Sequence, residues 1–564
     1  MHRFNGSQLL LVLLALIAAM TILTHRLPEG GRDATGEQGM VVSVSRPATL
    51  VGLGILRQGG NAVDAAVATA FALAVTFPEA GNIGGGGFMM VAPPDSEPVC
   101  IEYRETAPAA ATPTMYAPEE TQLGHRAVGV PGTVRGLALA HARFGSLPWR
   151  TLVEPAVLLA REGFVVDGRL ARSLNRLLDT AGEFRELVRV FGKPGGRRWR
   201  AGDRLVQPDL ARTLTLIAAE GPDAFYRGAI AQQIVAEMQA GGGLVALADL
   251  AAYDAQERTP IHGTFRGYDV YGPPPPSSGG IVLVEMLNIL SACEVDWRNR
   301  WSPDVVHAII EAMRRAYCDR ARYLGDPDFV SIPDQLVSSD YARRLAAGID
   351  RARATPSESL APEIALAPDS PSTTHFSIID DDGLAVSNTY TLEQSYGSRV
   401  VVRGAGFLLN NEMGDFNTRP GVTDRQGGIG TEPNLIAPGK RMLSAQTPVI
   451  VMKDRQPVLV TGSPGGRTIP NTVLQVVLGM LACEQDLRAA SDDPRLHHQW
   501  FPDRVKFEGA RQRRFAPLVA ALRARGHDVV DDDDRQGDAH SIFVRDGVYY
   551  GVADRRISGF AAGW

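Results

Sequence analysis

The sequence predicts an α+β protein, and two kinds of pattern support that class. Runs of β-favouring residues meet at tight turns, which is typical of antiparallel strands, and the clearest pair lies within 373–391. Elsewhere apolar residues recur with helical spacing, at 132–144, 151–162, 208–219, 226–240 and 303–322. With 564 residues, of which 45% are hydrophobic and 21% charged, the chain can bury a large core.

The chain begins with an apolar stretch that predicts export. Residues 9–23 are apolar apart from Thr21 and follow His2 and Arg3. The stretch is shorter than the roughly 20 residues of a spanning helix and fits the hydrophobic region of a secretory signal. Because no clear small-residue cleavage site follows it, an uncleaved membrane anchor is the alternative. Both interpretations place the protein outside the cytoplasm, periplasmic or otherwise extracytoplasmic, and residues 28–38, rich in glycine and charge, predict a linker.

The next elements are a helix, a glycine-rich turn and two strands. Asn61 can cap a helix that ends before Pro78, and the glycine-rich run 81–87 follows it. A phosphate-binding loop follows a strand and opens a helix, whereas this run follows a helix and opens a strand. We therefore expect a closely packed turn and no nucleotide site. Residues 88–92 and 99–103 predict a pair of strands.

The clearest hairpin has a defined register. An Asp-Gly pair between two β-rich runs is a strong hairpin signal. A loop of 381–383 sets Asp380 opposite Leu384, and counting back sets Thr373 opposite Thr391. A two-residue loop would shift this pairing by one. In either register the Cβ atoms of the two threonines lie within about 4.5–8 Å.

Four motifs along the chain together resemble one family. They are Thr-Thr-His-Phe-Ser from residue 373, Thr-Tyr-Thr at 389–391, Leu-Leu-Asn-Asn-Glu-Met-Gly-Asp-Phe at 408–416 and Thr-Gly-Ser-Pro-Gly-Gly at 461–466. In this order they resemble the γ-glutamyltranspeptidase (glutathione hydrolase) family of N-terminal nucleophile hydrolases, from about residue 39 to the end. The resemblance implies that a precursor cuts itself between Ser372 and Thr373.

The same resemblance implies how the chain is organised. After residues 1–38, which form the signal or anchor with its linker, a large subunit of 39–372 and a small subunit of 373–564 form a heterodimer. Together they build a four-layer αββα sandwich, with two antiparallel sheets between layers of helices. Residues 355–371, rich in proline, serine and alanine, predict an exposed segment that ends at the cut.

Once Thr373 begins a chain, it carries both parts of a nucleophilic site. A threonine hydroxyl is a weak nucleophile and needs a base, and the α-amino group of the same residue supplies one. Its reference pKa of about 7.7–8.0 leaves a useful neutral fraction near neutral pH, so no separate histidine is required. The resemblance assigns Thr391 to orient Thr373. Gly465 and Gly466, which follow a predicted strand, can aim backbone N–H groups at an oxyanion.

The resemblance also assigns the substrate-binding residues. Arg104, after the strand at 99–103, matches an arginine that holds the substrate α-carboxylate, a task that suits its planar fork. Ser444 matches one of two serines beside that carboxylate. The remaining matches grip the α-amino group, and they are Glu393, Glu412 and Asp415.

The chain departs from the family pattern at two positions. Ala445 stands where many members have a second serine, and Gln426 stands near the tip of a predicted lid, 416–441, where some members have an aromatic residue. The first departure predicts weaker substrate affinity, and the second puts lid closure in question.

The predicted function is cleavage of the γ-glutamyl amide of glutathione and related compounds, through a γ-glutamyl-Thr acyl-enzyme. Water then hydrolyses the ester, or an amino acid or peptide accepts the acyl group. Two alternatives remain: a sister acylase acting on β-lactam side chains or poly-γ-glutamate, and an uncut binding protein without catalysis. The net charge of −6 gives no case for nucleic acid.

Other features predict structure rather than chemistry, and no cofactor or metal is expected. Cys100, Cys293, Cys318 and Cys483 show no metal spacing and predict isolated thiols, with a disulfide as the alternative in an exported protein. The adjacent histidines at 497–498 point apart in a strand or loop and are taken as structural. The prolines at 273–276 predict a rigid turn into a helix, the basic run 197–200 predicts a solvated loop, and so does the acidic run 531–534.

Overall fold

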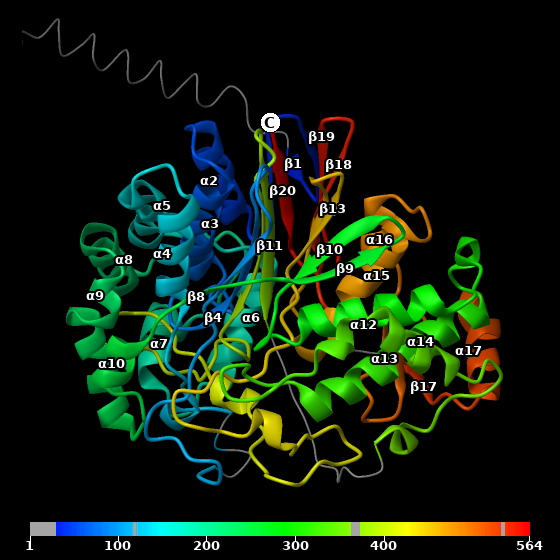
Figure 1. The fold of residues 1–564 in the computed structure, drawn as a ribbon. Helices are drawn as coiled ribbons and strands as arrows, with labels where there is room; N and C mark the ends of the chain where they lie inside the picture. The colour runs from blue at the N-terminus through cyan, green and yellow to red at the C-terminus, as the bar shows by residue number, and fades with distance from the viewer. Residues whose placement is uncertain (1–29, 117–119, 121, 362–372, 532–535) are drawn as a thin grey trace, which may run out of the picture.

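The computed structural model describes residues 30–116, 120, 122–361, 373–531 and 536–564. Two central sheets face each other and a layer of helices covers the outer side of each, so the predicted four-layer αββα sandwich is confirmed (Figure 1). Apolar residues from both sheets, including Met40, Phe88, Ile379 and Ile542, form the core between them. This shared core is what fixes the two sheets face to face.

The first sheet has eight strands and carries the predicted nucleophile hairpin at its centre. Its strands, in spatial order, are β1 (Gly30–Gly31), β20 (Phe560–Gly563), β3 (Gly39–Ser43), β11 (Thr374–Asp380), β12 (Ala385–Thr391), β4 (Gly86–Ala92), β5 (Val99–Glu102) and β8 (Gln256–Arg258). The hairpin β11–β12 thus pairs on both sides with strands that precede the predicted cut. Neither side of that cut can complete this sheet alone.

The second sheet has seven strands and carries the loops that surround the hairpin. In spatial order they are β2 (Asp33–Gly36), β19 (Val548–Ala553), β18 (His540–Arg545), β14 (Gln456–Thr461), β13 (Val449–Lys453), β10 (Tyr268–Gly272) and β9 (Ile261–Phe265). The pairs that join them are antiparallel.

The prediction that residues 28–38 form a linker is wrong for most of its described part. β1 pairs with β20 at the edge of the first sheet, and β2 pairs with β19 at the edge of the second. Glycine and charge made this segment look irregular, yet an edge strand needs mainly backbone hydrogen bonds and tolerates exposed polar side chains. The segment therefore completes both sheets.

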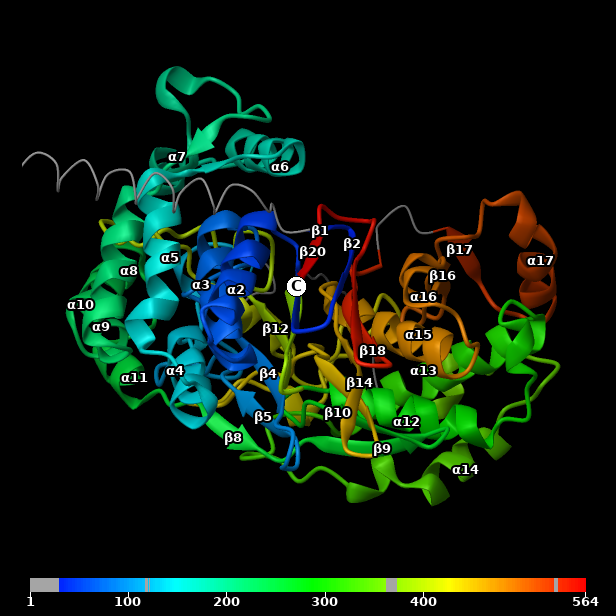
Figure 2. The ribbon, with the colours of Figure 1, turned by 90° about the horizontal axis from the view of Figure 1, so that it is seen from above.

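The helices on the first sheet pack through small apolar residues. α3 (Ala62–Thr76) is buried at all fifteen positions, and Asn61 caps it together with Asp64, as predicted. The predicted helix at 226–240 is interrupted around Gly228. The layer consists of α2 (Arg46–Arg57), α3, α4 (Thr133–Phe144), α5 (Trp149–Glu162), α8 (Pro208–Glu220), α9 (Asp223–Tyr226), α10 (Ala229–Gly241) and α11 (Leu247–Ala252). α6 (Gly168–Asp179) and α7 (Arg185–Phe191), with the small pair β6 (Phe164–Val165) and β7 (Arg204–Leu205), project from it (Figure 2).

The helices on the second sheet include one, α13, that buries several charged residues. They are α12 (Gly279–Ala292), α13 (Pro303–Tyr323), α14 (Ser339–Ala347), α15 (Ile469–Leu481), α16 (Leu487–Asp492) and α17 (Ala516–Ala524), with a small sheet of β15 (Leu496–His497), β16 (Val505–Phe507) and β17 (Val529–Asp531). α12 follows the proline-rich turn at 273–276, as predicted. α13 runs under several loops of the candidate site.

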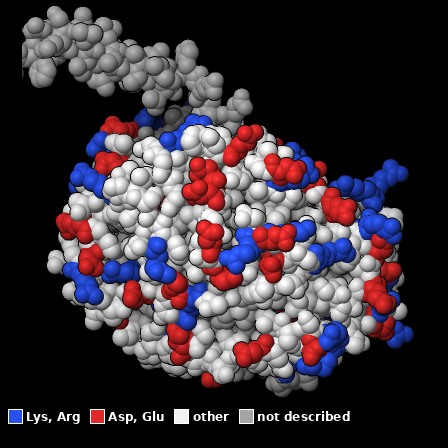
Figure 3. Space-filling model, turned by 45° about the horizontal axis from the view of Figure 1, so that its top comes forward, with Lys and Arg blue, Asp and Glu red and all other residues white. Residues whose placement is uncertain are grey.

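Several other predictions can be compared with the structure. The four cysteines are unpaired thiols, as predicted. Within the described residues, no helix is long and apolar enough to cross a membrane. The apolar stretch 9–23 lies outside those residues, as does most of the acidic run 531–534. Figure 3 shows acidic and basic side chains interspersed over one face of the molecule.

Candidate active site

The hairpin has the predicted register. Thr374 pairs with Tyr390 and the ladder continues without a shift to Ile379 and Ala385, while the Asp380 N–H donates to the Leu384 carbonyl at 3.2 Å. Thr373, one residue before β11, is partly buried. Continuing the ladder by one pair sets it opposite Thr391, as the three-residue loop predicts.

Thr391 is fixed from two sides at the end of β12. Its Oγ1 accepts the Glu393 N–H at 2.8 Å, and its carbonyl accepts the Asn82 Nδ2 at 2.9 Å. A Cβ on Gly85 would lie 2.0 Å from that carbonyl oxygen. The glycine-rich run therefore permits a close approach between the turn and the hairpin, as expected. Asn82, which the sequence analysis did not single out, is the residue that joins them.

Arg104 lies at the centre of a group of acids, of which Glu105 and Glu412 are buried and Asp415 is partly exposed. The arginine lies two residues after the end of β5 and is fully buried, unlike most arginines at strand ends. Its guanidinium forms ion pairs with Glu412 at 2.6 Å, with Glu105 at 3.3 Å and with Asp415, and its Nε donates to the Met442 carbonyl at 3.2 Å. The structure thus brings the predicted carboxylate-binding residue together with two of the predicted amino-binding acids.

The charges in this group do not balance. Burial lowers the pKa of Arg104, but the neighbouring carboxylates reverse the effect and raise it overall. Burial raises the pKa of Glu105 to about 8 and that of Glu412 well above its usual range, although Arg104 opposes both shifts. One guanidinium faces three carboxyls, so we expect the group to hold a proton near neutral pH. A ligand with its own positive charge would offset this excess of acid.

Glu393 joins the same region through a buried amide. The Asn411 side chain donates from Nδ2 to Glu393 and accepts the Gln394 N–H at 3.0 Å. The backbone N–H of Asn411 donates to the Leu392 carbonyl at 3.0 Å. Because Asn411 directly precedes Glu412, it links the turns that carry two predicted amino-binding acids. This role was not predicted from the sequence, although the Asn-Asn pair at 410–411 is part of the motif at 408–416.

The segment around Ser444 rests on the proline-rich turn. The Ser444 N–H donates to the Pro276 carbonyl at 2.8 Å, and its own carbonyl accepts both the N–H and Oγ of Ser278, at 2.8 and 2.7 Å. Ser444 and Ala445 are both buried. The predicted scaffold role of the turn is therefore visible as a support beneath the segment that carries Ser444.

The predicted oxyanion loop follows β14 and lies against the hairpin. A Cβ on Gly462 would lie 2.4 Å from the ring of His375, so this loop packs closely on β11 two residues after Thr373. Gly465 and Gly466 have φ angles of 131° and 55°, in the region that favours glycine. Burial lowers the pKa of His375 well below its usual value, so its imidazole is neutral there.

Two predicted exposed segments are partly buried. Ser357 and Ala361, within the described part of 355–371, are buried, while 362–372 lies outside the described residues. Trp199 in the basic run 197–200 is also buried, and its Nε1 donates to the Phe191 carbonyl at 2.7 Å. Composition did not predict this burial, because a proline- or arginine-rich segment can still pack one or two side chains into the protein interior. In the predicted lid, Gln426 is exposed.

Two sets of residues contain histidines that can be compared with the geometry of a metal site, the pair at 497–498 and one further group. His497 contacts Asn471 and His498 contacts Asp503. Within the described residues, ligand atoms of His307, Glu311 and His527 lie within 4.8 Å of one another.

The geometry of this last group favours hydrogen bonds over a metal. Its two imidazole nitrogens are 2.7 Å apart, a hydrogen-bond distance, whereas two nitrogens on one tetrahedral zinc lie about 3.3 Å apart. The nearby guanidiniums of Arg314 and Arg315 already neutralise Glu311.

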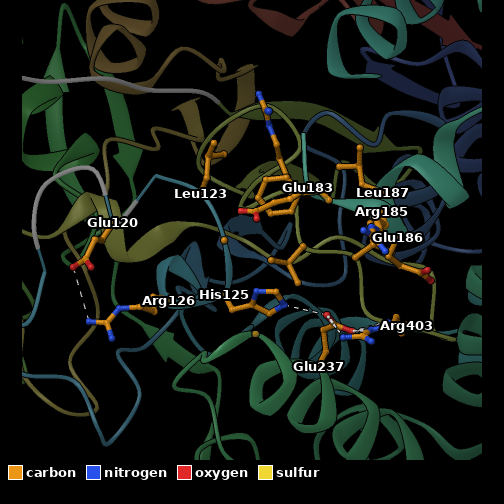
Figure 4. A pocket seen from close by; sticks show the side chains of 16 residues that line it. Glu120, Leu123, His125, Arg126, Glu183, Arg185, Glu186, Leu187, Glu237 and Arg403 are labelled. Carbon is orange, nitrogen blue, oxygen red and sulfur yellow. Dashed lines mark hydrogen bonds and ion pairs between the residues drawn. The ribbon is translucent and has the colours of Figure 1, made fainter. Parts of the chain in front are cut away.

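A separate pocket has a volume of about 600 Å³. In Figure 4 its His125 points toward Glu237, which also faces Arg403. Neither the predicted nucleophile nor any predicted substrate-binding residue lines it.

The four-layer sandwich, with a threonine directly before a central strand, defines the class of N-terminal nucleophile hydrolases. The family model for gamma-glutamyltranspeptidase matches residues 48–564. The glutathione hydrolase proenzyme of Escherichia coli (strain K12) is 44% identical over 539 residues, which cover 94% of this chain and 92% of that one. The acylase ACY 1 proenzyme of Pseudomonas sp. (strain SE83) is 37% identical and covers 94% of both chains.

A solved structure, that of the cephalosporin acylase from Bacillus halodurans, superposes with a TM-score of 0.83 at 30% identity, over 94% of this chain and 97% of that one. The chain belongs to the γ-glutamyltranspeptidase family.

Proposed function

We propose that this protein is a self-processing γ-glutamyl hydrolase and transferase that acts on glutathione and related γ-glutamyl compounds. The observation that carries the proposal is that the buried Arg104 forms ion pairs with the buried Glu412 and with the partly exposed Asp415. A guanidinium beside carboxylates matches the two charges of a free α-amino-acid head group. The 44% identity to a glutathione hydrolase proenzyme supports the same substrate class.

The reaction is acyl transfer through Thr373. Its Oγ attacks the γ-carbonyl carbon, and its α-amine takes the hydroxyl proton and passes it to the departing nitrogen. The C–N bond breaks and leaves a γ-glutamyl ester on Thr373. Water, or the amine of an amino acid or peptide, then attacks that ester; the α-amine takes a proton from the attacking group and passes it to Thr373 Oγ1 as the ester C–O bond breaks, which frees the enzyme. The N–H groups of Gly465 and Gly466 hold the oxyanion in both steps, and Thr391 orients the nucleophile.

The α-amine exists only after the chain is cut, so processing is part of the function. The cut between Ser372 and Thr373 gives a large subunit that ends at 372 and a small subunit of 373–564, which stay together as a heterodimer. The central position of β11 and β12 in the first sheet supports this, because both subunits share its hydrogen bonds. No metal or cofactor takes part in the proposed steps.

We further propose that the protein is exported and works outside the cytoplasm, with 9–23 as its signal or as a membrane anchor. Fractionation of cells that express the full chain, with sequencing of the mature N-terminus, tests this. A soluble cytoplasmic protein that keeps residues 1–38 would contradict it.

A sister acylase is the second candidate, favoured by the likeness to acylase ACY 1 and to the cephalosporin acylase. The two candidates differ in the head group they recognise. A γ-glutamyl anilide carries the α-amino and α-carboxylate groups, and a glutaryl anilide lacks the amino group. Preference for the γ-glutamyl compound supports the first candidate, and preference for the glutaryl compound supports the acylase. A chain that stays uncut and inactive is the binding protein.

Two substitutions in the predicted substrate-binding site, one at Arg104 and one at Ala445, test how the α-carboxylate is bound. Arg104→Ala removes a charge-assisted contact and should raise KM by roughly tenfold or more, because hydrogen bonds to charged groups contribute about 1.5–3 kcal/mol. Ala445→Ser adds a neutral contact and should lower KM several-fold with little change in kcat. If Arg104→Ala leaves the turnover of glutathione unchanged, Arg104 does not bind the α-carboxylate of the substrate.

A further inference from the structure

Glu102 contacts Arg104 and Arg441, which lie on the two segments that carry the predicted carboxylate-binding residues Arg104 and Ser444. It is the last residue of β5, is fully buried, and is not itself among the residues expected to touch substrate. One of its oxygens accepts the Arg104 N–H at 2.8 Å and lies 3.0 Å from the Nε of Arg441. The other accepts the Nε of Arg258 at 3.2 Å. A single carboxylate therefore ties the backbone of Arg104 to the side chain of Arg441.

Arg441 begins the segment that leads to Ser444. Its N–H donates to Asp326 Oδ2 at 2.7 Å, and its Nη2 donates to the Asp254 carbonyl at 2.8 Å. Met442, the next residue, accepts the Nε of Arg104 through its carbonyl. Since Ser444 is only three residues beyond Arg441, the position of Arg441 sets where this short segment starts.

The backbone of Arg104 is held from both ends. Its N–H donates to Glu102, and its carbonyl accepts the hydroxyl of Tyr253 at 2.8 Å. The Ala107 N–H donates to the Lys440 carbonyl at 2.8 Å, so the segment after Arg104 also bonds to the residue before Arg441. Arg104 and the Arg441 segment thus form one unit, and the Glu102 side chain is the buried group that bonds to both.

We propose that Glu102 is a positioning residue for substrate binding: it sets the spacing between the Arg104 guanidinium and the 441–444 segment, so that both meet the α-carboxylate of a γ-glutamyl substrate. The inference rests on the proposed function. An α-carboxylate that contacts two elements loses affinity when their spacing changes. The nucleophile and the oxyanion loop lie on other elements, so Glu102 acts on KM and leaves kcat and self-cleavage intact.

A simple removal of Glu102 would leave the guanidiniums of Arg258 and Arg441 to share the one carboxylate of Asp328, and the protein would be destabilised for that reason alone. The double variant Glu102→Gln with Arg258→Gln removes one cation together with the carboxylate. Arg258→Gln alone is its matched control, since it keeps the contacts of Glu102 with Arg104 and Arg441. Glu102→Asp keeps the charge but shortens the side chain by one methylene, which weakens its simultaneous reach to both.

The experiment measures KM and kcat for a chromogenic γ-glutamyl anilide, the fraction of cut chain on an SDS gel and the melting temperature. KM should rise in the order wild type and Arg258→Gln, then Glu102→Asp, then the double variant. The KM of the double variant should be about tenfold higher than that of Arg258→Gln, as for the loss of a charge-assisted contact. Values of kcat within about twofold, full self-cleavage and a melting temperature close to that of Arg258→Gln separate positioning from a loss of structure.

Equal KM values for the double variant and Arg258→Gln would overturn the inference, and so would a fall in kcat at constant KM. If the double variant does not mature, Glu102→Asp against wild type decides, and an unchanged KM there overturns the inference as well. If the wild-type protein does not hydrolyse the anilide at all, the proposed function itself fails.

Discussion

Helices α3 and α13 lie on opposite sides of the two sheets, yet they bury different kinds of side chain. α3 is buried along its whole length and carries one charged residue, Asp64, which caps the helix and binds the N–H of Ser146. α13 is also largely buried, but its buried positions include His307, Glu311, Arg314, Arg315, Asp319 and Arg320. α3 packs against the first sheet, whereas α13 packs against α12 and holds loops.

The contacts of α13 explain its buried charge. Arg314 donates to the hydroxyl of Ser357 at 2.7 Å, and Arg320 donates to that of Ser278 at 3.0 Å. The Tyr317 hydroxyl donates to the carbonyl of Arg467, directly after the predicted oxyanion glycines. The carbonyl of Ala321 accepts the hydroxyl of Thr431 in the predicted lid at 2.6 Å. Irregular segments expose backbone polar groups, so a helix that supports them needs polar partners.

The comparison predicts that the two helices respond differently to substitution. Buried ion pairs contribute little net stability compared with apolar packing. Removing one partner is nevertheless costly, because the other charge stays buried without a partner. Small apolar residues in a tight interface have the opposite weakness, because added volume cannot be accommodated.

The largest effect is expected at Arg314. It is buried and pairs with Glu311 at 3.2 Å and with Asp503, so Arg314→Met leaves Asp503 without its guanidinium partner and Glu311 with Arg315 alone. The free energy of unfolding should fall by about 3–5 kcal/mol, as for a broken buried pair. Denaturant unfolding of the mature protein measures it. A loss below about 1 kcal/mol would mean that this pair is solvated, and the contrast with α3 would fail.

The counterpart on the other face is Gly52, where α2 meets α3. A Cβ there would lie 2.3 Å from Thr69 Oγ1 and 3.5 Å from the Ala65 carbonyl. Gly52→Ala should therefore cost about 1–3 kcal/mol by overpacking, in the same assay. Gly54→Ala is the matched control, because only the side chain of Gln58 lies within 4 Å of its added Cβ. Equal stability of the two variants would contradict tight packing between α2 and α3.

Glu285 on α12 extends the comparison to pH. Burial raises the pKa of its carboxyl well above the usual range, and the neighbouring Asp319 on α13 adds to the rise. Asp319 itself accepts the Tyr341 hydroxyl at 2.5 Å and lies 3.9 Å from Arg322. The folded state therefore binds a proton that the unfolded state releases near pH 4.3. Stability from this group is present below that pH and is lost as pH rises, by up to about 1.4 kcal/mol per unit until the folded pKa is reached.

Glu285→Gln removes this titration. Thermal melts of wild type and variant from pH 5 to 8 should show the variant gaining over wild type as pH rises. A constant difference across that range would show that Glu285 is ionised in the folded protein.

The smallest effect is expected for a surface pair outside both helices. Arg351 and Glu294 are 3.2 Å apart, with side chains 75% and 88% exposed. Water and salt screen such pairs. Glu294→Gln should leave the melting temperature unchanged, and a clear drop would show that charge matters to stability irrespective of burial.

The same contrast explains what the sequence could predict. The hairpin register followed from a three-residue turn, and α3 followed from a capping residue and an apolar run, because both are local. The meeting of Arg104 with Glu412 joins positions about 300 residues apart, so only the family resemblance pointed to it. Glu102 and Asn411 gave no signal of their own, since an isolated acid or amide is usually solvated. The strands β1 and β2 were missed because their pairing depends on backbone groups that composition does not report.

The central claim, that Thr373 becomes the first residue of a chain and acts as its nucleophile, has one direct test. Residues 373–564 are 192 of the 564 residues, so the small subunit should have a mass of about 21 kDa, given 60.6 kDa for the whole chain. Mass spectrometry and N-terminal sequencing of the purified protein should find that subunit beginning Thr-Thr-His-Phe. Thr373→Ala should give a single uncut chain without γ-glutamyl anilide hydrolysis. A small subunit that starts elsewhere, or an alanine variant that is cut at the same bond, would contradict the account.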